Sequence, residues 1–351
     1  MNDVVAEWTE RIREAADQRT PLRIRGGGSK DFYGGALRGE TFETSAYRGI
    51  VDYDSTELVL SARSGTPLTE IEDALAGKNQ MLAFEPPHFG PATLGGCIAA
   101  GLSGPRRAAA GSVRDFVLGV RILDGRGADL AFGGRVIKNV AGYDVSRLMT
   151  GALGTLGVIL DISLKVLPAP AAERTLRLEM SQDDAIRALN QWAAQPLPIS
   201  ATCHAGNTLT LRLSGADAGI TAAAARIGGQ RIDDGSGFWN RLREQQHDFF
   251  QGDDPLWRLA VKSTAPALPL PGQQLIEWNG ALRWIKTATD AALVRDVARK
   301  AGGHATLFRA QESAVTAFHP LPDALLQLHR RLKQTFDPAG ILNPGRLYAE
   351  L

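Results

Sequence analysis

The sequence predicts an α+β fold built from more than one domain. A chain of 351 residues exceeds what one ordinary hydrophobic core holds, so two domains are expected. Short apolar segments typical of strands alternate with amphipathic segments typical of helices along the chain. The pattern starts afresh after "APAAERT" (169–175), which is typical of a linker. These observations predict two successive sets of strands and helices.

The first set of elements extends to the proline at position 168. Its expected helices cover 4–16 and 65–79, and its expected strands cover 21–25, 57–63, 80–86 and 154–168, with a β-hairpin over 117–133. The hairpin is indicated by the Asp124–Gly125 and Arg126–Gly127 steps, which are turn residues. For the second helix we expect Thr66 as the N-cap, Pro67 in the first helical position and Gly77 at the end.

The second set predicts a module with strands on one face and helices on the other. Its expected strands cover 175–180, 207–215, 256–263 and 281–287, and its expected helices cover 181–195, 216–229 and 290–303. Ser181 is the expected N-cap of the first of these helices. The tail 323–348 predicts an amphipathic helix, stopped by Asp337–Pro338 and followed by a proline- and glycine-rich end.

Composition excludes several classes of protein. Hydrophobic residues make up 44% and charged residues 22%, as in globular proteins rather than disordered ones. A net charge of +1 gives no large field for nucleic acid or an acidic membrane. Cys97 and Cys203 are the only cysteines, which argues against a disulfide framework and against cysteine-ligated zinc or iron–sulfur clusters. The charged N-terminus predicts no signal peptide, and no run of 18 apolar residues predicts a membrane span.

Three adjacent glycines stand in "LRIRGGGSKDFYGG" (22–35), between an apolar-basic run and a lysine. Such a run lets backbone N–H groups approach a phosphate closely, with Arg25 and Lys30 adding positive charge, or it forms a flexible turn. The segment after it lacks the helical period that a Rossmann fingerprint requires, and "GGGSK" reverses the order of a Walker A loop. The run alone therefore leaves the phosphate cradle and the turn both open.

Two further stretches are unusually rich in glycine. The segment 89–119 holds seven glycines, and a long loop of this kind in a compact domain favours a bound ligand over plain surface. The segment 133–159 combines glycines with a set of polar residues, each of which is more typical of a surface or fold residue than of a catalyst: Lys138, Asn139, Tyr143 and Asp144.

Four motifs in order resemble the FAD-binding module of the vanillyl-alcohol oxidase/PCMH flavoprotein family: "RGGGSK", "ATLGGCIAAGLSGPRR…GSVRD", "KNVAGYD…GALGTLGV" and the terminal "FDPAGILNPGR". Within that family the chain is most similar to the FAD-binding subunits of bacterial glycolate oxidase. The resemblance implies a PCMH-type two-subdomain FAD-binding fold in an α+β chain. It places an FAD-binding domain at 1–170, a short α+β cap domain at 171–315, and a C-terminal helix and tail at 316–351 that return to the FAD domain.

The resemblance also implies which residues hold non-covalent FAD. The first loop would hold the pyrophosphate, and its residues are Arg25, Gly26, Gly27, Gly28, Ser29 and Lys30. The second side of the clamp would be Thr93, Leu94, Gly95 and Gly96. Beside the flavin and ribityl chain would lie Gly101, Gly111, Ser112 and Asp115, while Gly157, Val158 and Ile159 would meet the ring systems through backbone groups. Arg346 would close the site from the C-terminus.

No catalytic residue or metal site is predicted. The six histidines show no paired metal-binding spacing, and family members that oxidise 2-hydroxy acids carry a histidine cluster in a larger cap. His88 precedes the second FAD loop and is either a loop histidine or a flavin-side base or attachment site, with the loop histidine favoured. Arg106 and Arg107 either bind an anion or are solvated surface charges.

Three functions stay open at this point. The resemblance favours a redox subunit that works with a larger FAD-linked glycolate oxidase subunit and an iron–sulfur subunit. It would oxidise glycolate or a similar 2-hydroxy acid and pass electrons toward a membrane acceptor, from the cytoplasm or the periphery of the inner membrane. A stand-alone dehydrogenase is the second reading. A scaffold subunit with a structural flavin is the third.

Overall fold

The structure is a computed structural model that describes residues 2–134, 144–311 and 315–351. Its N-terminal part is built around a five-stranded antiparallel sheet of order β3-β4-β8-β6-β7. The strands of this sheet are β3 (Ile50–Asp54), β4 (Val59–Arg63), β6 (Val117–Leu123), β7 (Asp129–Gly133) and β8 (Val158–Lys165). Two small pairs accompany it, the parallel pair β1 (Leu22–Arg25) and β2 (Glu40–Glu43), and the antiparallel pair β5 (Gln80–Met81) and β9 (Leu167–Pro168).

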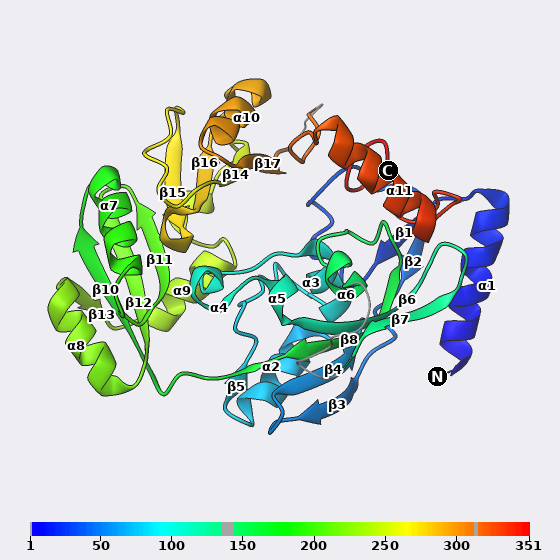
Figure 1. The fold of residues 1–351 in the computed structure, drawn as a ribbon, viewed down its shortest axis with the longest axis horizontal. Helices are drawn as coiled ribbons and strands as arrows, with labels where there is room; N and C mark the ends of the chain where they lie inside the picture. The colour runs from blue at the N-terminus through cyan, green and yellow to red at the C-terminus, as the bar shows by residue number, and fades with distance from the viewer. Residues whose placement is uncertain (1, 135–143, 312–314) are drawn as a thin grey trace.

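Helices of the N-terminal part pack on both the five-stranded sheet and the small β1-β2 pair. They are α1 (Asn2–Gln18), α2 (Leu68–Ala76), α3 (Leu94–Ala100), α4 (Arg107–Ala110), α5 (Val113–Phe116) and α6 (Val145–Leu148). The main core lies between α2, α3 and the sheet, with Ile71, Ile98 and Ile162 fully buried. Along α1, Trp8 and Ile12 pack against Phe42 of β2. Figure 1 shows α1 at the edge of the molecule, away from the second sheet.

The second part is an eight-stranded sheet in which every neighbouring pair is antiparallel, in the order β13-β10-β12-β11-β15-β16-β14-β17. Its strands are β10 (Ala172–Glu179), β11 (Ile199–Ala205), β12 (Thr208–Gly215), β13 (Gln230–Ile232), β14 (Leu256–Ala260), β15 (Gln273–Glu277), β16 (Leu282–Lys286) and β17 (His304–Arg309). Its helical segments are α7 (Gln182–Ala193), α8 (Asp217–Ile227), α9 (Gly235–Arg243), η1 (Asp248–Phe250), η2 (Trp278–Gly280) and α10 (Ala291–Lys300).

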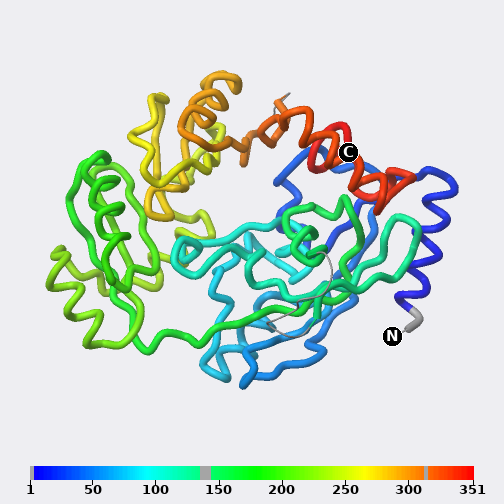
Figure 2. The backbone as a smooth tube through the Cα atoms, in the orientation of Figure 1, coloured from blue at the N-terminus to red at the C-terminus, as the bar shows by residue number. Residues whose placement is uncertain are grey.

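The chain crosses between the two parts twice. Figure 2 shows the backbone leaving β8 for β10, and later returning from β17 to α11 (Asp323–Phe336) beside the N-terminal part. The tail after α11 forms a parallel bridge from Leu342 to Leu22 of β1. An aromatic cluster that includes Tyr33, Trp278 and Phe308 is buried between the two parts. This tail and this aromatic cluster therefore bring together segments that lie far apart in the chain.

Most of the expected elements are confirmed, including the α+β class, the hairpin over β6 and β7, and Ser181 as the N-cap of α7. The expected domain boundary at 170/171 falls between β9 and β10 and stays a prediction. No helix among the described residues is both long and apolar enough to cross a membrane.

Four expectations about local structure are wrong. Pro67, not Thr66, occupies the N-cap position of α2, because the Thr66 hydroxyl is engaged by the Gly49 N–H at 2.9 Å. The expected strand 80–86 is limited to β5, since Glu85 takes a left-handed backbone. The expected linker 169–175 already belongs to β10 from Ala172 onward. The glycine-rich segment 89–119 is not an open loop, because it contains α3, α4 and α5.

Candidate functional site

The main cavity of the N-terminal part lies where the glycine run, the start of α3 and the C-terminal tail meet. It holds about 760 Å³ of space free of protein atoms, a volume that includes its mouth, which is open to solvent. Twelve of the predicted site residues line it: Arg25, Gly26, Gly27, Gly28, Ser29, Lys30, Thr93, Gly95, Gly96, Gly157, Ile159 and Arg346. All four sequence motifs thus contribute to one cavity.

The glycine run is explained first by contacts within the chain. A Cβ on Gly27 would lie 1.5 Å from the carbonyl oxygen of Pro91, and a Cβ on Gly26 would lie 2.3 Å from Oγ1 of Thr93. Gly28 has a φ of +71°, which a side chain rarely adopts. The absence of side chains therefore lets the loop pass directly against the segment before α3.

The same loop presents unused hydrogen-bond donors. Between Gly26 and Lys30, no backbone N–H donates a hydrogen bond to another residue that the structure describes. Ser64 also lines the cavity, and its buried Oγ has no partner among the described residues. Orphan donors of this kind are rare in protein interiors and are met by water or a ligand. The cavity wall thus offers a set of N–H and O–H groups suited to an oxygen-rich anion.

Lys30 and Arg25 carry the positive charge at this wall, but they differ in how free that charge is. The Lys30 Nζ donates to the carbonyl of His88 at 3.1 Å and makes no ion pair with a described carboxylate. Burial lowers the pKa of Lys30 from its ordinary value. Arg25 instead pairs with Asp31 at 3.1 Å and Glu43 at 3.3 Å, and these carboxylates raise its pKa. Lys30 is therefore the cation with charge available for a ligand.

Arg346 fixes the shape of the first loop rather than presenting its charge. Its guanidinium donates to the carbonyl oxygens of Lys30 at 3.2 Å, Asp31 at 3.0 Å and Gly35. Asn343 acts in the same way, because its Oδ1 accepts from the Ile24 N–H at 2.8 Å while its Nδ2 donates to the Leu153 carbonyl. The tail therefore ties β1, the glycine loop and the 151–157 segment into one wall.

The start of α3 contributes surface but few donors. Thr93 is the N-cap, and its Oγ1 accepts from the Gly96 N–H at 3.3 Å. The Gly95 N–H donates to the Ser64 carbonyl at 2.7 Å, and the Leu94 N–H donates to the Thr66 carbonyl at 2.9 Å. The amides expected to form the second side of a pyrophosphate clamp are thus already bonded within the chain. What Gly95 and Gly96 offer the cavity is close approach without side chains.

Six predicted positions do not line this cavity. The side chains of Leu94 and Val158 are fully buried in the core. Gly101 ends α3 in a left-handed conformation, and the remaining three lie at α5, where Ser112 and Asp115 form a capping box beside Gly111. The roles inferred for these positions from the resemblance stay predictions. Lys138, Asn139 and Tyr143 lie outside the described residues, and Asp144 caps α6.

His88, Arg106 and Arg107 are held by contacts within the protein. The His88 Nε2 lies 3.1 Å from Glu72, and its own N–H and that of Phe89 donate to the Glu244 carboxylate. His88 lines neither the main cavity nor the pocket described below.

Arg106 is neither an anion ligand nor a solvated surface charge, so both alternatives predicted from the sequence are wrong. Arg106 is 7% exposed and bonds to Glu85 at 3.2 Å and to Glu173 at 2.5 Å, which joins the two parts of the molecule. Arg107 stacks on Trp278, with its guanidinium carbon 4.4 Å from the ring centre.

Sequence reasoning missed Ser64, Gly154 and Asn343 as parts of the cavity. Gly154 and Asn343 stand inside motifs that the sequence singles out, "GALGTLGV" and "NPGR", so the signal was present at the level of the segment. Ser64 follows a buried strand and has no distinguishing pattern around it.

Comparisons with known proteins show the family of the chain. Residues 4–132 match a family model described as "FAD binding domain", and residues 320–347 match one described as "FAD linked oxidases, C-terminal domain". Over 343 residues the chain is 50% identical to glycolate oxidase subunit GlcE of Escherichia coli (strain K12), which covers 97% of both chains. It is 29% identical over 164 residues to glycolate oxidase subunit GlcD of Bacillus subtilis (strain 168), covering 46% of this chain and 35% of that one.

One more sequence relative and one solved structure are also similar to the chain. A D-lactate dehydrogenase of Archaeoglobus fulgidus is 29% identical over 195 residues, or 54% of this chain and 43% of the relative. Among solved structures, alkyldihydroxyacetonephosphate synthase superposes with a TM-score of 0.67 at 16% identity, covering 97% of this chain and 75% of that chain. The structural likeness supports the fold alone.

Proposed function

Because this chain belongs to the family of FAD-linked oxidoreductases that contains glycolate oxidase subunit GlcE, we propose that it is the FAD-binding redox subunit of a glycolate oxidase complex. The proposed reaction is the oxidation of glycolate, or a similar small 2-hydroxy acid, to glyoxylate. The carrying observation is the identity of 50% over 97% of both chains, since similarity that spans the full length includes cap and tail as well as the cofactor module.

The residues of the main cavity fit FAD. The diphosphate of FAD needs N–H donors and positive charge, and the loop 26–30 supplies unbonded amides beside Lys30. The glycine-lined wall at Gly95, Gly96 and Gly157 leaves room for flat ring systems to approach the backbone. The unpartnered Ser64 Oγ provides a further polar contact. We infer that these groups bind the cofactor non-covalently.

When bound, FAD supplies the two-electron oxidation, and the chain supplies position and electrostatics. Lys30 and the loop amides hold negative charge, while Arg346 and Asn343 keep the loop in its binding shape through carbonyl and amide contacts. The aromatic cluster around Tyr33 and Phe308 excludes water between the two parts of the molecule.

We infer that the electrons leave through partner subunits. The two cysteines, Cys97 and Cys203, are buried singly, so this chain offers no thiolate set for a cluster among its described residues. The proposal therefore includes a larger FAD-linked subunit, an iron–sulfur subunit and a membrane acceptor, with the complex cytoplasmic or peripheral at the inner membrane. Within the chain we propose an FAD-binding domain at 1–170, a cap at 171–315, and a returning tail at 316–351.

The test is anaerobic reduction of the flavin by glycolate. The chain is purified alone and in complex with the co-expressed partner subunits, and the visible spectrum is followed as glycolate is added. If the flavin bleaches only when the partner subunits are present, and bleaching is lost when Lys30 of this chain is replaced, the result supports the redox subunit. Bleaching of the chain alone supports the stand-alone dehydrogenase, and a flavin in this chain that stays oxidised in a turning-over complex supports the scaffold.

A further inference from the structure

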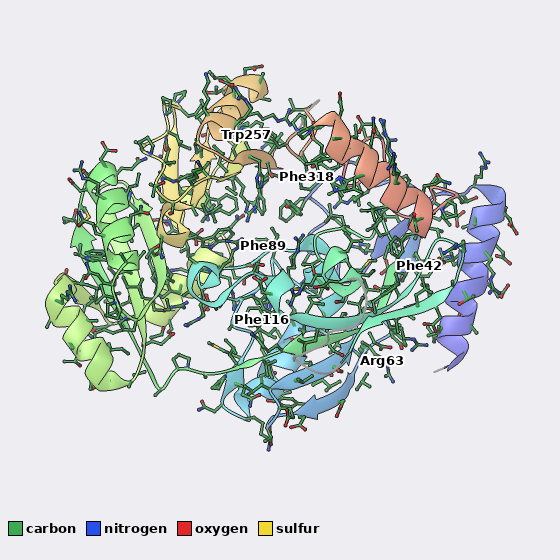
Figure 3. All side chains as sticks on the ribbon, in the orientation of Figure 1. Phe42, Arg63, Phe89, Phe116, Trp257 and Phe318 are labelled. Atoms are coloured by element: carbon green, nitrogen blue, oxygen red, sulfur yellow. The ribbon has the colours of Figure 1, made fainter. Side chains whose placement is uncertain are left out.

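A second pocket, distinct from the main cavity, lies where the eight-stranded sheet meets the N-terminal part. It holds about 360 Å³ of space free of protein atoms, a volume that includes its mouth, which is open to solvent. Its walls are mostly apolar, with Phe89 and Leu102 from one side and Leu242, Leu282 and Phe308 from the other. Figure 3 shows Phe89 between the sheet and the N-terminal part. Three ionisable side chains also line the pocket, Arg243, Arg258 and Glu277.

Strand register places Arg258 and Glu277 on one face of the sheet. Arg258 of β14 pairs with Trp284 of β16, and Glu277 of β15 pairs with Leu282 of β16. Trp284 and Leu282 are two residues apart and therefore point to the same face. All four line the pocket, so this face of three neighbouring strands forms its floor.

Arg258 is a half-buried cation that makes no ion pair with a carboxylate in the described ranges. Its guanidinium forms no hydrogen bond or ion pair with any residue in the described ranges, and its one close aromatic contact is Trp278, whose ring centre lies 5.1 Å away. Burial lowers its pKa, yet an arginine keeps its proton in proteins. A charge that is partly withdrawn from water and makes no ion pair is stabilised when an anion binds it.

Glu277 does not supply that anion. Its Oε1 accepts from the Trp284 indole N–H at 2.7 Å, and it makes no ion pair with Arg258. Burial raises the pKa of Glu277 to about 7, so near neutral pH much of it is protonated. Arg258 is then left with its charge, and Glu277 stands beside it as a hydrogen-bonding group for a ligand hydroxyl.

The neighbourhood of Arg258 is held in a strained arrangement. Trp278 has a φ of +53°, which is rare for a side chain of this size, whereas the adjacent Asn279, at +55°, is of a residue type that adopts this conformation more readily. The strain is fixed by hydrogen bonds, since the Trp278 indole N–H donates to the Gly104 carbonyl at 3.0 Å and the Asn279 N–H donates to the Thr202 hydroxyl at 2.9 Å. Trp278 is thereby positioned as a stacking partner for the guanidinium.

The other cation at the pocket is already engaged. Arg243 donates to Glu244 at 2.8 Å and lies 3.9 Å from Glu72. Of the lining residues, Arg258 therefore offers charge for one carboxylate, and the remaining wall is too apolar for a second.

We propose that this pocket binds the carboxylate of a small monocarboxylic 2-hydroxy acid, with Arg258 as its anion-binding residue and Glu277 beside the hydroxyl group. That the acid is the substrate rests on the proposed function. The binding of a monocarboxylate at Arg258 does not rest on it.

Direct binding of [2-¹³C]glycolate to the FAD-loaded protein, measured by NMR titration, tests the pocket. R258M is expected to weaken glycolate binding by at least about thirtyfold, because it removes the one free charge. The matched control is R107M, which removes a cation from the same indole outside the pocket and is expected to change affinity less than about fivefold. Tartronate, which adds a second carboxylate to glycolate, is expected to bind at least about tenfold more weakly.

Several outcomes would overturn the pocket assignment. Glycolate binding that survives R258M, an equal loss in R107M, or tartronate that binds as tightly as glycolate each contradict it. If R258M does not fold, R258K decides, since a lysine cannot donate two parallel N–H groups and must weaken binding several-fold. An R258K variant with unchanged affinity contradicts the assignment.

The proposed function is judged separately. A complex that fails to oxidise glycolate, while glycolate still binds in an Arg258-dependent manner, overturns the substrate role and supports the site. A complex that oxidises glycolate with an unchanged KM in R258M overturns the site and leaves the proposed function standing. Retention of FAD by R258M, read from its visible spectrum, separates both cases from loss of the cofactor.

Discussion

Replacing Glu277 by glutamine should change how the stability of the protein depends on pH. The carboxyl of Glu277 is 5% exposed, and burial raises its pKa from 4.5 to about 7. In the unfolded chain the group loses its proton near pH 4.5, whereas in the folded protein it keeps the proton until about pH 7. The folded state therefore binds more protons in this window, and stability falls as pH rises from about 4.5 to 7.

The magnitude follows from the width of that window. At about 1.36 kcal/mol for each pH unit, the ionised carboxylate lowers the free energy of unfolding by roughly 3 kcal/mol at pH 8. A glutamine of the same shape still accepts from the Trp284 indole and never ionises. With roughly 2.1 cal/mol/K of unfolding entropy per residue, the E277Q variant should melt about 4 °C above the natural protein at pH 8 and close to it at pH 4.5.

The assay is a thermal melt followed by tryptophan fluorescence at pH 4.5, 6, 7 and 8. An E57Q variant, in an exposed turn, is the control and should overlay the natural protein at every pH. A melting difference for E277Q that does not grow between pH 4.5 and 8 would refute the reasoning. It would mean that Glu277 is ionised throughout and compensates Arg258, which would also weaken the case for an anion in that pocket.

Three further substitutions probe the main cavity. G27A should destabilise the protein by about 1–3 kcal/mol and lower its FAD content, because the new methyl group meets the Pro91 carbonyl; an unchanged melt with full FAD content contradicts the packing of this loop. R346M should weaken FAD binding about tenfold or more, because it frees the loop carbonyls that the guanidinium holds; FAD affinity equal to that of the natural protein, measured by flavin fluorescence, rules this out. H88A should keep FAD, since the imidazole contacts Glu72 away from the cavity, and a colourless H88A protein would show a cofactor role for this histidine.

Much of the fold follows from local pattern, as the positions of α7 and the β6–β7 hairpin illustrate. Ser181 and the turn glycines act on their immediate neighbours, so their effect is visible in a short stretch of sequence. Thr66 shows the limit of this reasoning. It has a hydroxyl suited to an N-cap, but that hydroxyl accepts a hydrogen bond from the N–H of Gly49, 17 residues away. A helix-capping pattern covers only a few neighbouring residues, so it cannot predict a hydrogen-bond partner this far away in the sequence.

For the candidate site too, some features could be predicted from short stretches of sequence and others could not. The glycine run at 26–28 could be recognised in the sequence, but the reason for the glycines could not be predicted. Close contact with Pro91 and close contact with a ligand both require residues without side chains. Arg258 and Glu277 were invisible, since each stands in an ordinary strand and gains meaning only from the sheet register that brings them together. Asn343 was equally hidden, because its partner Ile24 lies 319 residues away.

The most direct test of the account is the flavin content of the purified chain. The protein is isolated alone, its visible spectrum is recorded, and the flavin released on denaturation is identified and quantified against the protein. The cavity formed by the glycine loop, α3 and the tail predicts the spectrum of an oxidised flavin and one FAD released per chain. A folded chain that carries no flavin and takes up none from excess FAD would contradict the central claim.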